Sequence, residues 1–567
     1  MALGLGTGTA DNAAGCRPRS PVVDRLAGLL LGRATFVQVL LMAGLPVLVC
    51  VWLLIAPERV FSRTMTADLL FNLTGAWSLH NGLVPHVDYH DPVGVLSLLL
   101  TELGFRIVGP RPHAMLVGEL IFLAFAFTLA MVAARSRLPS LAAAIFVLYA
   151  ALLVLLPTNI GDQPHLYSFA MSYNRWSWCL LTTLCLILFL PPRQEHQRAA
   201  HDVSSAIVLL AAMFYLKITF FAAGVVALAL AVVLMPHIRR DMRWWIAGLA
   251  LLAVGVLAPF NHAYLSDLWY ASRSGYARLL MGDLVRNFLV NKAEYAIYVS
   301  SVAVLLWLWR CGRAPWQAAA ASGFLVGLCM LVVSQNSLQV GTVPVGVVIL
   351  MMVYMAARPA DREAASVTAT VPRLLATLVL PAISIAGMVA SLVGYYAWAR
   401  SGTGLLTVGQ TNLRGLAVPA AAIDSYHLSL NGRMTVGMQP DNAEAVDIEA
   451  LLEAASLFAD GRHGRPRLMI ADQLNPLPFI VGFPPPRGAN LWSFPGAPDR
   501  SAEAIYGDVD YVLVPKFVVV HIAKPAARVV YDRYLADNFV AMQETRYWSV
   551  LARRHPQMPM ATGISDP

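Results

Sequence analysis

The sequence predicts a polytopic α-helical membrane protein that ends in an α/β domain. Of its 567 residues, 58% are hydrophobic and 13% are charged, where soluble proteins carry about 25% charge. Apolar runs near the roughly 20 residues needed to cross a bilayer recur between about 34 and 398. From 399 onward the chain is mixed and punctuated by proline and glycine. This composition excludes an ordinary soluble enzyme.

Charge divides the chain at the same place. The whole sequence has 41 Lys+Arg against 33 Asp+Glu, and from Arg400 onward we count 15 against 16. The net charge of +8 therefore lies in the membrane half, where short cytoplasmic loops are expected to be basic, and it gives no reason to expect a nucleic-acid partner. We predict a cytoplasmic arm (1–33), a transmembrane domain (34–398) and a C-terminal, extracytoplasmic α/β domain (399–567).

Arginine clusters set the predicted topology in the plasma (inner) membrane. Four arginines precede the first apolar run, which predicts a cytoplasmic N terminus. Five further basic turns fall on the same side if 93–109 lies on or re-enters the outer face and if 204–235 is a hairpin turning near Lys217. About eleven spans result, near 34–56, 114–134, 139–157, 176–192, 204–216, 218–235, 243–260, 293–309, 315–333, 341–357 and 374–398.

This threading gathers the long loops on one side. Segments 57–113, 158–175 and 261–292 lie outside with the C-terminal domain. Loops longer than about 12–15 residues are uncommon unless they are functional, and the first of these is much longer. We therefore expect the chemistry in the outer loops, and above all in 57–113.

The first outer loop concentrates acidic and imidazole side chains. Asp68 precedes a helix-like segment and an Asn-Gly turn, after which come His86, Asp88, His90 and Asp91. Asp88 and Asp91 are three residues apart and would share one face of a helical turn. One interpretation is a general base with a supporting carboxylate, because activating a hydroxyl requires a carboxylate or imidazole close to it. The other is a polar, solvated loop with an Asp-Pro turn, and spacing alone favours neither.

A motif in this loop resembles a known family. Asp68, followed by a Gly-x-x-Pro-x-x-Asp-Tyr-x-Asp-x-x-Gly run from Gly82 to Gly94, is similar to the first outer loop of the GT-C membrane glycosyltransferases. The resemblance is to bacterial members related to the protein mannosyltransferases and the aminoarabinose transferases of lipid A. Phe214–Phe220 resembles the lysine-containing turn in a hydrophobic hairpin of those proteins. The predicted spans and outer domain are a further likeness. Where the aminoarabinose subgroup has Glu-Lys-Pro, this chain has His90-Asp91-Pro92.

The resemblance implies a GT-C-like fold and an inverting transfer of a sugar. The donor would be linked to a polyprenyl phosphate, and the acceptor would be a glycan, lipid or protein on the non-cytoplasmic face. A carboxylate assists an oxocarbenium-like transition state, so Asp68 is the candidate base and Asp88 or Asp91 would orient it or the acceptor. His86 and His90 are candidate substrate-binding residues. The cysteines and histidines do not have the spacing typical of a zinc site. No motif indicates a cofactor, and a requirement for a divalent cation stays open.

The leaving phosphate needs cationic or amide partners. Lys217 is the first candidate, because an ammonium in an apolar hairpin is costly, although it could equally snorkel to the interface. Asn174 and Arg175 stand at the outer mouth of a span, where an interfacial anchor beside aromatic residues is the alternative.

The C-terminal domain is expected to alternate short strands and helices. Arg467–Gln473 ends a predicted strand in polar groups, a place where ligands often bind, and the aromatic residues Trp492 and Phe494 follow a proline-rich loop.

Two rival functions remain open. A transporter or flippase of a lipid-linked or polar substrate would need ionisable residues along a path through the spans, and an assembly factor would bind an outer partner through its C-terminal domain.

Overall fold

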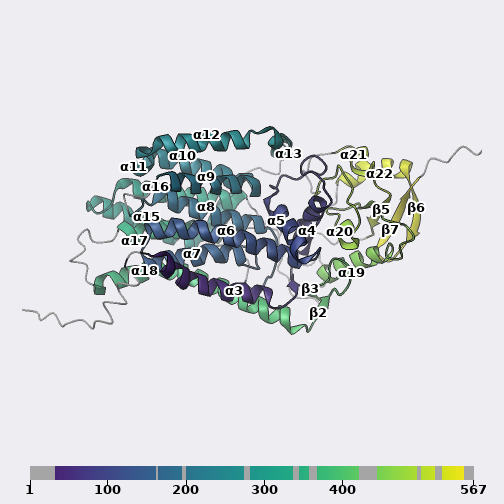
Figure 1. Ribbon diagram of the computed structural model, residues 1–567, viewed down its shortest axis with the longest axis horizontal. Coiled ribbons are helices and arrows are strands. Elements are labelled where there is room, and N and C mark those ends of the chain that lie inside the picture. The colour runs from purple at the N-terminus through teal and green to yellow at the C-terminus, as the bar shows by residue number, and fades with distance from the viewer. Residues whose placement is uncertain are drawn as a thin grey trace, which may run out of the picture.

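The protein is described from a computed structural model. It covers Gly32 and residues 34–160, 164–193, 199–273, 281–335, 344–356, 367–420, 443–493, 500–516 and 526–554. Most of the predicted N-terminal arm and Phe494 therefore lie outside the described residues. Within them, an elongated helical bundle forms one half of the molecule and a smaller α/β part caps one of its ends (Figure 1).

Long apolar stretches form the bundle because a helix satisfies every backbone polar group within itself, which a lipid environment requires. Its helices run as follows: α2 (Phe36–Val39), η1 (Leu40–Gly44), α3 (Leu45–Ile55), α6 (His113–Arg137), α7 (Ser140–Leu155), α8 (Ser172–Phe189), α9 (Ala199–Leu216), α10 (Ile218–Leu234), α11 (Pro236–Arg240), α12 (Met242–Val256), η2 (Pro259–Asn261), α13 (His262–Arg273), α14 (Met281–Val290), α15 (Lys292–Arg310), α16 (Trp316–Gln335), α17 (Gly346–Ala356) and α18 (Val367–Ser401).

Each predicted span coincides with a helix. Five of the described helices are long and apolar enough to cross a membrane, and up to seven are if each of two bent pairs counts as one span. Three shorter apolar helices are α7, α10 and α17, whereas α8 is not among the helices that are apolar enough to cross. The chain is thus a multi-pass membrane protein, and the count of about eleven crossings stays a prediction. The hairpin turn at Lys217 is present, because α9 ends at Leu216 and α10 begins at Ile218.

The first long loop contributes two helices at the capped end of the bundle. They are α4 (Thr66–His80) and α5 (Leu96–Val108). With 13 residues, α5 is about 20 Å long, which is shorter than the roughly 30 Å of a hydrocarbon core. It packs on α6 so closely that a methyl group at Gly104 would lie 2.0 Å from the carbonyl oxygen of Ala114. Its length agrees with the prediction that 93–109 does not span.

The C-terminal region forms two small sheets. In the first, β1 (Val60–Phe61) pairs in parallel with β3 (Leu416–Pro419), which pairs antiparallel with β2 (Leu405–Thr407). The second has the order β4-β5-β7-β6, and only β4 and β5 are parallel. The remaining bounds are α19 (Ala443–Ser456), β4 (Leu468–Ile470), α20 (Leu477–Val481), α21 (Ala502–Tyr506), β5 (Tyr511–Pro515), α22 (Ala526–Asn538), β6 (Phe539–Glu544) and β7 (Trp548–Arg553). The predicted alternation of strands and helices is therefore present, and β1 joins it to the first loop.

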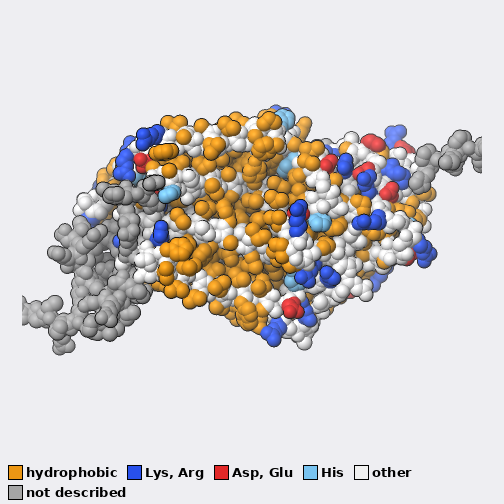
Figure 2. Space-filling model, viewed as in Figure 1, with side chains coloured by type: hydrophobic (Ala, Val, Ile, Leu, Met, Phe, Trp, Pro, Cys, Tyr) orange, Lys and Arg blue, Asp and Glu red, His pale blue; other side chains and the backbone are white. Residues whose placement is uncertain are grey.

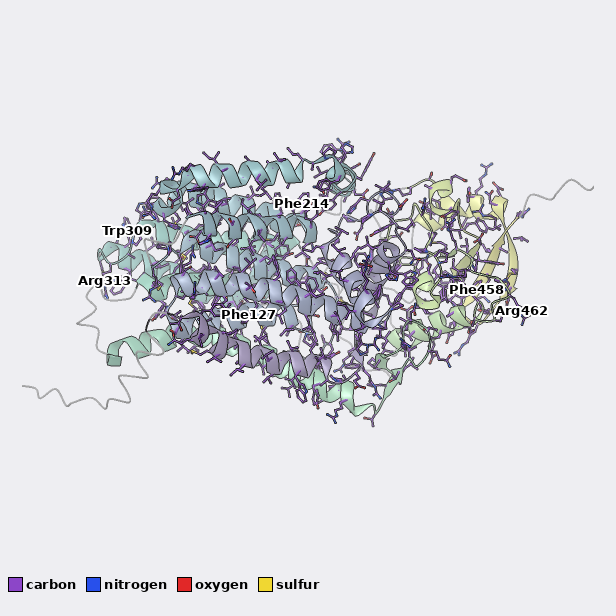
Figure 3. The ribbon with its side chains drawn as sticks, viewed as in Figure 1. Phe127, Phe214, Trp309, Arg313, Phe458 and Arg462 are labelled. Carbon is purple, nitrogen blue, oxygen red and sulfur yellow. The ribbon has the colours of Figure 1, made fainter. Side chains whose placement is uncertain are left out.

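Polar and apolar surfaces separate along the long axis. Hydrophobic side chains cover the flank of the bundle, and charged side chains gather at its two ends and over the α/β part (Figure 2). Arg313 lies at the end of the bundle opposite to Phe458 and Arg462 (Figure 3). This division suits a bundle that crosses a bilayer with its α/β part on one side.

Candidate active site

Asp68 lies in the first turn of α4, where the helix dipole favours a carboxylate. The helix begins after Met65, whose φ of 53° is in the left-handed region. The preceding residues are fixed by hydrogen bonds from the backbone N–H groups of Arg63 and Thr64 to the carbonyl oxygen of Tyr167, at 2.8 and 3.3 Å. The start of α4 therefore rests against Tyr167.

Asp88 organises a tight turn rather than a helix. Its Oδ2 accepts a hydrogen bond from the N–H of Val84 at 2.8 Å, and its own N–H donates to the carbonyl oxygen of Val84 at the same distance. Nε of Arg487 lies 3.8 Å from Asp88 Oδ1. Asp88 and Asp91 thus do not share a helical face, because the chain between Gly82 and Gly94 forms successive turns.

Asp267 on α13 is the centre of a charged network that the sequence did not indicate. Its carboxylate lies 3.1 Å from Nδ1 of His86 and 3.0 Å from Nδ1 of His90. Nη2 of Arg500 donates to it at 2.9 Å, and the N–H of Asp91 donates at 3.3 Å. Although burial opposes ionisation, the two histidines outweigh it and lower the pKa of Asp267 to about 2. A charged Asp267 therefore ties the first loop, α13 and the C-terminal region together.

Asp91 is enclosed and nearly dry. Its side chain is 4% exposed; Oδ1 accepts from the N–H of Val93 at 3.0 Å, and Oδ2 has no hydrogen-bond partner among the described residues. Burial, with a smaller contribution from Asp267, raises the pKa of Asp91 to about 8. The carboxyl group is therefore largely protonated at neutral pH.

This raised pKa predicts a pH-dependent stability. A folded-state pKa above the ordinary value of about 3.9 means that Asp91 favours folding below pH ~4 and that this contribution is lost as pH rises to about 8. Between pH 5 and 8 the wild type should lose thermal stability relative to Asp91→Asn, and above about pH 8 the difference should stay constant. Melting curves of both proteins in detergent measure this, and a difference independent of pH would contradict it.

Lys217 and Asn174 meet at the loop-side end of the bundle. Nζ of Lys217 donates to Oδ1 of Asn174 at 2.9 Å and lies 5.4 Å from the ring centroid of Tyr173. Asn174 is completely buried, and its Nδ2 has no hydrogen-bond partner among the described residues. The two residues, 43 positions apart in the chain, thus present an ammonium and an amide N–H side by side.

Arg175, the residue after Asn174, is a second buried cation. It is fully buried, and its Nη1 donates to the carbonyl oxygen of Thr158 at 3.1 Å. Glu119 on α6, also fully buried, places Oε1 3.8 Å from Nη2 of Arg175. Neither oxygen of Glu119 accepts a hydrogen bond from another described residue. At this distance the ion pair is loose.

Gly94 brings the acidic loop to the hairpin turn. Its N–H donates to the carbonyl oxygen of Leu216 at 3.1 Å, next to Lys217. A methyl group on Gly94 would lie 2.1 Å from the carbonyl oxygen of Tyr215, so only glycine permits this approach. The last residue of the loop motif and the hairpin lysine are therefore neighbours.

The loop also pairs with the C-terminal region. The N–H of His90 donates to the carbonyl oxygen of Ala489 at 3.1 Å, and the N–H of Leu491 donates to the carbonyl oxygen of His90 at 2.9 Å. These two bonds fix the loop against residues 489–491 of the C-terminal region.

Sequence reasoning missed Asp267, Arg500 and Glu119. A signal existed for Glu119, since an acidic residue within an apolar run suggests a buried partner. Nothing local marks Asp267 or Arg500. In the described part of the chain, no group of three or more His, Cys, Asp or Glu side chains is arranged to hold a metal ion.

No protein-family model and no curated protein matches the chain. Solved structures do. ArnT from Cupriavidus metallidurans in the apo state is 12% identical, with a TM-score of 0.44 over 91% of this chain and 97% of that one. The same protein bound to undecaprenyl phosphate is also 12% identical, with a TM-score of 0.40 over 92% of this chain and 98% of that one. The arabinofuranosyltransferase AftD from Mycobacteria is 12% identical, with a TM-score of 0.45 over 93% of this chain and 41% of that one.

Proposed function

We propose that this protein is an integral membrane glycosyltransferase that uses a polyprenyl-phosphate-linked sugar as donor. The observation that supports this most directly is the hydrogen bond between Lys217 and Asn174 at the loop-side end of an apolar bundle, next to an acidic loop. A lipid phosphate holds its head group at the membrane interface, where buried cations can neutralise it. The acceptor would then approach from the side of the C-terminal region.

The proposed transfer needs one base and a stabilised leaving group. Asp68 takes the proton from the acceptor hydroxyl as the oxygen attacks the anomeric carbon. The bond from that carbon to the phosphate oxygen breaks, with inversion, and the polyprenyl phosphate leaves with the electron pair. Lys217, Arg175 and the amide of Asn174 stabilise the charge that develops on the phosphate. His86, His90, Asp88 and Asp91 shape the acceptor side.

The same proposal assigns sides to the chain. The first loop, 158–175 and the C-terminal region share one end of the bundle and would face the extracytoplasmic space, with the N terminus in the cytoplasm. The transfer assay that identifies the donor also identifies the acceptor as a glycan, lipid or protein, and the transferred sugar as a hexose or a pentose.

Transport is the weaker explanation. Two buried ion pairs involve α6: Glu119 with Arg175 near its first residue, and Arg137 with Asp202 at its last, with Nη2 of Arg137 2.7 Å from Asp202 Oδ2. Between Leu120 and Ala134 this helix has no ionisable residue. A path for a charged or polar substrate through the bundle would need such residues in between.

Asp68→Asn is expected to reduce sugar transfer by about 10²–10⁴-fold, the usual contribution of a general base. The assay is transfer from a panel of radiolabelled polyprenyl-phosphate sugars in membranes that contain equal amounts of each protein. Asp241→Asn is the control, because Asp241 lies at the opposite end of the bundle beside Arg240. Transfer by Asp68→Asn at the wild-type rate would refute the assigned base.

A further inference from the structure

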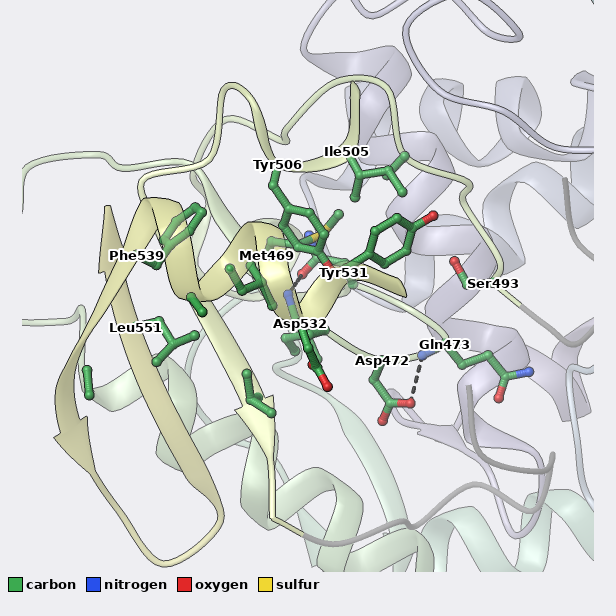
Figure 4. A pocket seen from close by; sticks show the side chains of 18 of the residues that line it. Met469, Asp472, Gln473, Ser493, Ile505, Tyr506, Tyr531, Asp532, Phe539 and Leu551 are labelled. Carbon is green, nitrogen blue, oxygen red and sulfur yellow. Dashed lines mark hydrogen bonds between the residues drawn. The ribbon is translucent and has the colours of Figure 1, made fainter. Parts of the chain in front are cut away.

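The C-terminal region contains a cavity that the proposed reaction does not use. It has a volume of about 480 Å³, within the range of about 300–1,000 Å³ typical of small-molecule sites. It opens beside the carboxyl end of β4, between the second sheet and α22 (Figure 4). This is the polar strand end, Ala471-Asp472-Gln473, that the sequence analysis noted as a place where ligands often bind.

The lining of the cavity has two chemically different sides. Tyr506, Tyr531 and Met469 cluster on one side, and Asp472, Gln473 and Ser493 lie on the other (Figure 4). The tyrosine rings are 5.7 Å apart in an edge-to-face arrangement. The Tyr531 hydroxyl donates to the carbonyl oxygen of Arg500 at 2.8 Å. A ligand would therefore contact the aromatic ring of Tyr531 and not its hydroxyl. Aromatic faces on one side and hydrogen-bonding groups on the other suit a sugar ring.

The side-chain amide of Gln473, in the lining, has an unsatisfied hydrogen-bond donor. Gln473 is 7% exposed, and its Nε2 makes no hydrogen bond to any described residue. A buried amide N–H without a partner costs about 1–3 kcal/mol, which an acceptor on a bound ligand would recover. A hydroxyl oxygen is such an acceptor.

Charge narrows the class of ligand. Two carboxylates, Asp472 and Asp532, and one guanidinium, Arg554, line the cavity. Carboxylates accept hydrogen bonds from hydroxyl groups but repel other anions. The cavity therefore favours a neutral or amino sugar over a phosphate or a uronic acid.

The cavity is connected to the acidic loop. Asn490 lines the cavity and forms a parallel bridge with His90, and the carbonyl oxygen of Ala489, also in the lining, accepts a hydrogen bond from the N–H of His90. Arg500 accepts a hydrogen bond from the Tyr531 hydroxyl at its carbonyl oxygen and binds Asp267 through its guanidinium. A sugar in the cavity would thus be bound on the same framework as His86 and His90.

We propose that this cavity binds a non-acidic saccharide, and that this saccharide is a part of the acceptor remote from the reacting hydroxyl. The first statement stands on the cavity alone, and the second rests on the proposed function. The cavity would hold the acceptor chain while its end reaches the acidic loop.

The test measures sugar binding by the full-length protein in detergent, without donor. Saturation-transfer difference NMR with methyl glycosides of neutral hexoses and pentoses, glucosamine and glucuronate is expected to detect neutral or amino sugars and not glucuronate. Asp532→Asn and Gln473→Leu should each weaken binding tenfold or more. Asp537→Asn is the matched control, since Asp537 is exposed on the same helix and does not line the cavity.

The outcomes separate the two proposals. Binding by Asp68→Asn at the wild-type level supports a site distinct from the reaction, and in transfer assays Asp532→Asn should raise the acceptor KM with kcat unchanged. Three results would overturn the cavity proposal and leave the proposed function standing. They are no binding of any neutral or amino sugar, binding by both cavity variants as strong as by the wild type, and binding of glucuronate as strong as that of the neutral sugars. Sugar binding without transfer from any donor would instead overturn the proposed function.

Discussion

Replacing Arg175 with methionine is expected to destabilise the protein by about 3–5 kcal/mol, the usual cost of leaving one member of a buried ion pair alone. Glu119 and Arg175 are both fully buried, and Glu119 accepts no hydrogen bond from another described residue. Without the guanidinium, the Glu119 carboxyl group would lose its partner at 3.8 Å, and the carbonyl oxygen of Thr158 would lose its bond to Nη1. Thermal or denaturant unfolding in detergent measures the loss.

A double variant separates stability from chemistry. Arg175→Met combined with Glu119→Gln removes both charges and should recover most of the lost stability, because a buried pair can often be replaced without cost. Transfer should nevertheless remain at least 10²-fold below the wild type if Arg175 binds the donor phosphate. Wild-type transfer by the stable double variant would show that Arg175 acts only in folding.

Asp267→Asn is the second substitution with a large expected effect. The carboxylate, 6% exposed, is shared by His86, His90 and Arg500, and charge-assisted hydrogen bonds of this kind contribute about 1.5–3 kcal/mol each. We expect a loss of about 3 kcal/mol or more in the free energy of unfolding and a loss of transfer, because the first loop loses its attachment to α13. Unfolding in detergent and the transfer assay measure the two effects.

Two comparisons make this prediction specific. Asp241→Asn removes a carboxylate from an exposed pair, 3.8 Å from Arg240, and should change stability by less than about 1 kcal/mol. A double-mutant cycle with Arg500→Met should show a coupling energy of at least about 1 kcal/mol, since the two side chains are in contact. Additive effects would mean that Arg500 and Asp267 do not stabilise each other.

Local pattern predicted the elements of the bundle well. The apolar runs, the helix over Leu69–His80, the Asn-Gly turn and the hairpin at Lys217 all have counterparts, because helix periodicity, turn residues and charge are written in neighbouring positions. In the C-terminal region the predicted strands at 468–471 and 511–514 match β4 and β5. Strand β1, with two residues, carried no pattern long enough to predict.

The candidate site, too, was predictable from the sequence only in part. The chemistry of phosphates and hydroxyl groups made Asp68, Asp91, Asn174, Arg175 and Lys217 candidates. The sequence alone determined a bundle of membrane helices, and it predicted the chemistry in the first long loop. Only the tertiary structure decided which of these meet. The bond between His86 and Asp267 joins positions 181 apart, and that between Arg500 and Asp267 joins positions 233 apart. Spacing within a helix or turn reports on neighbours a few residues away, so contacts between distant segments depend on how the helices pack.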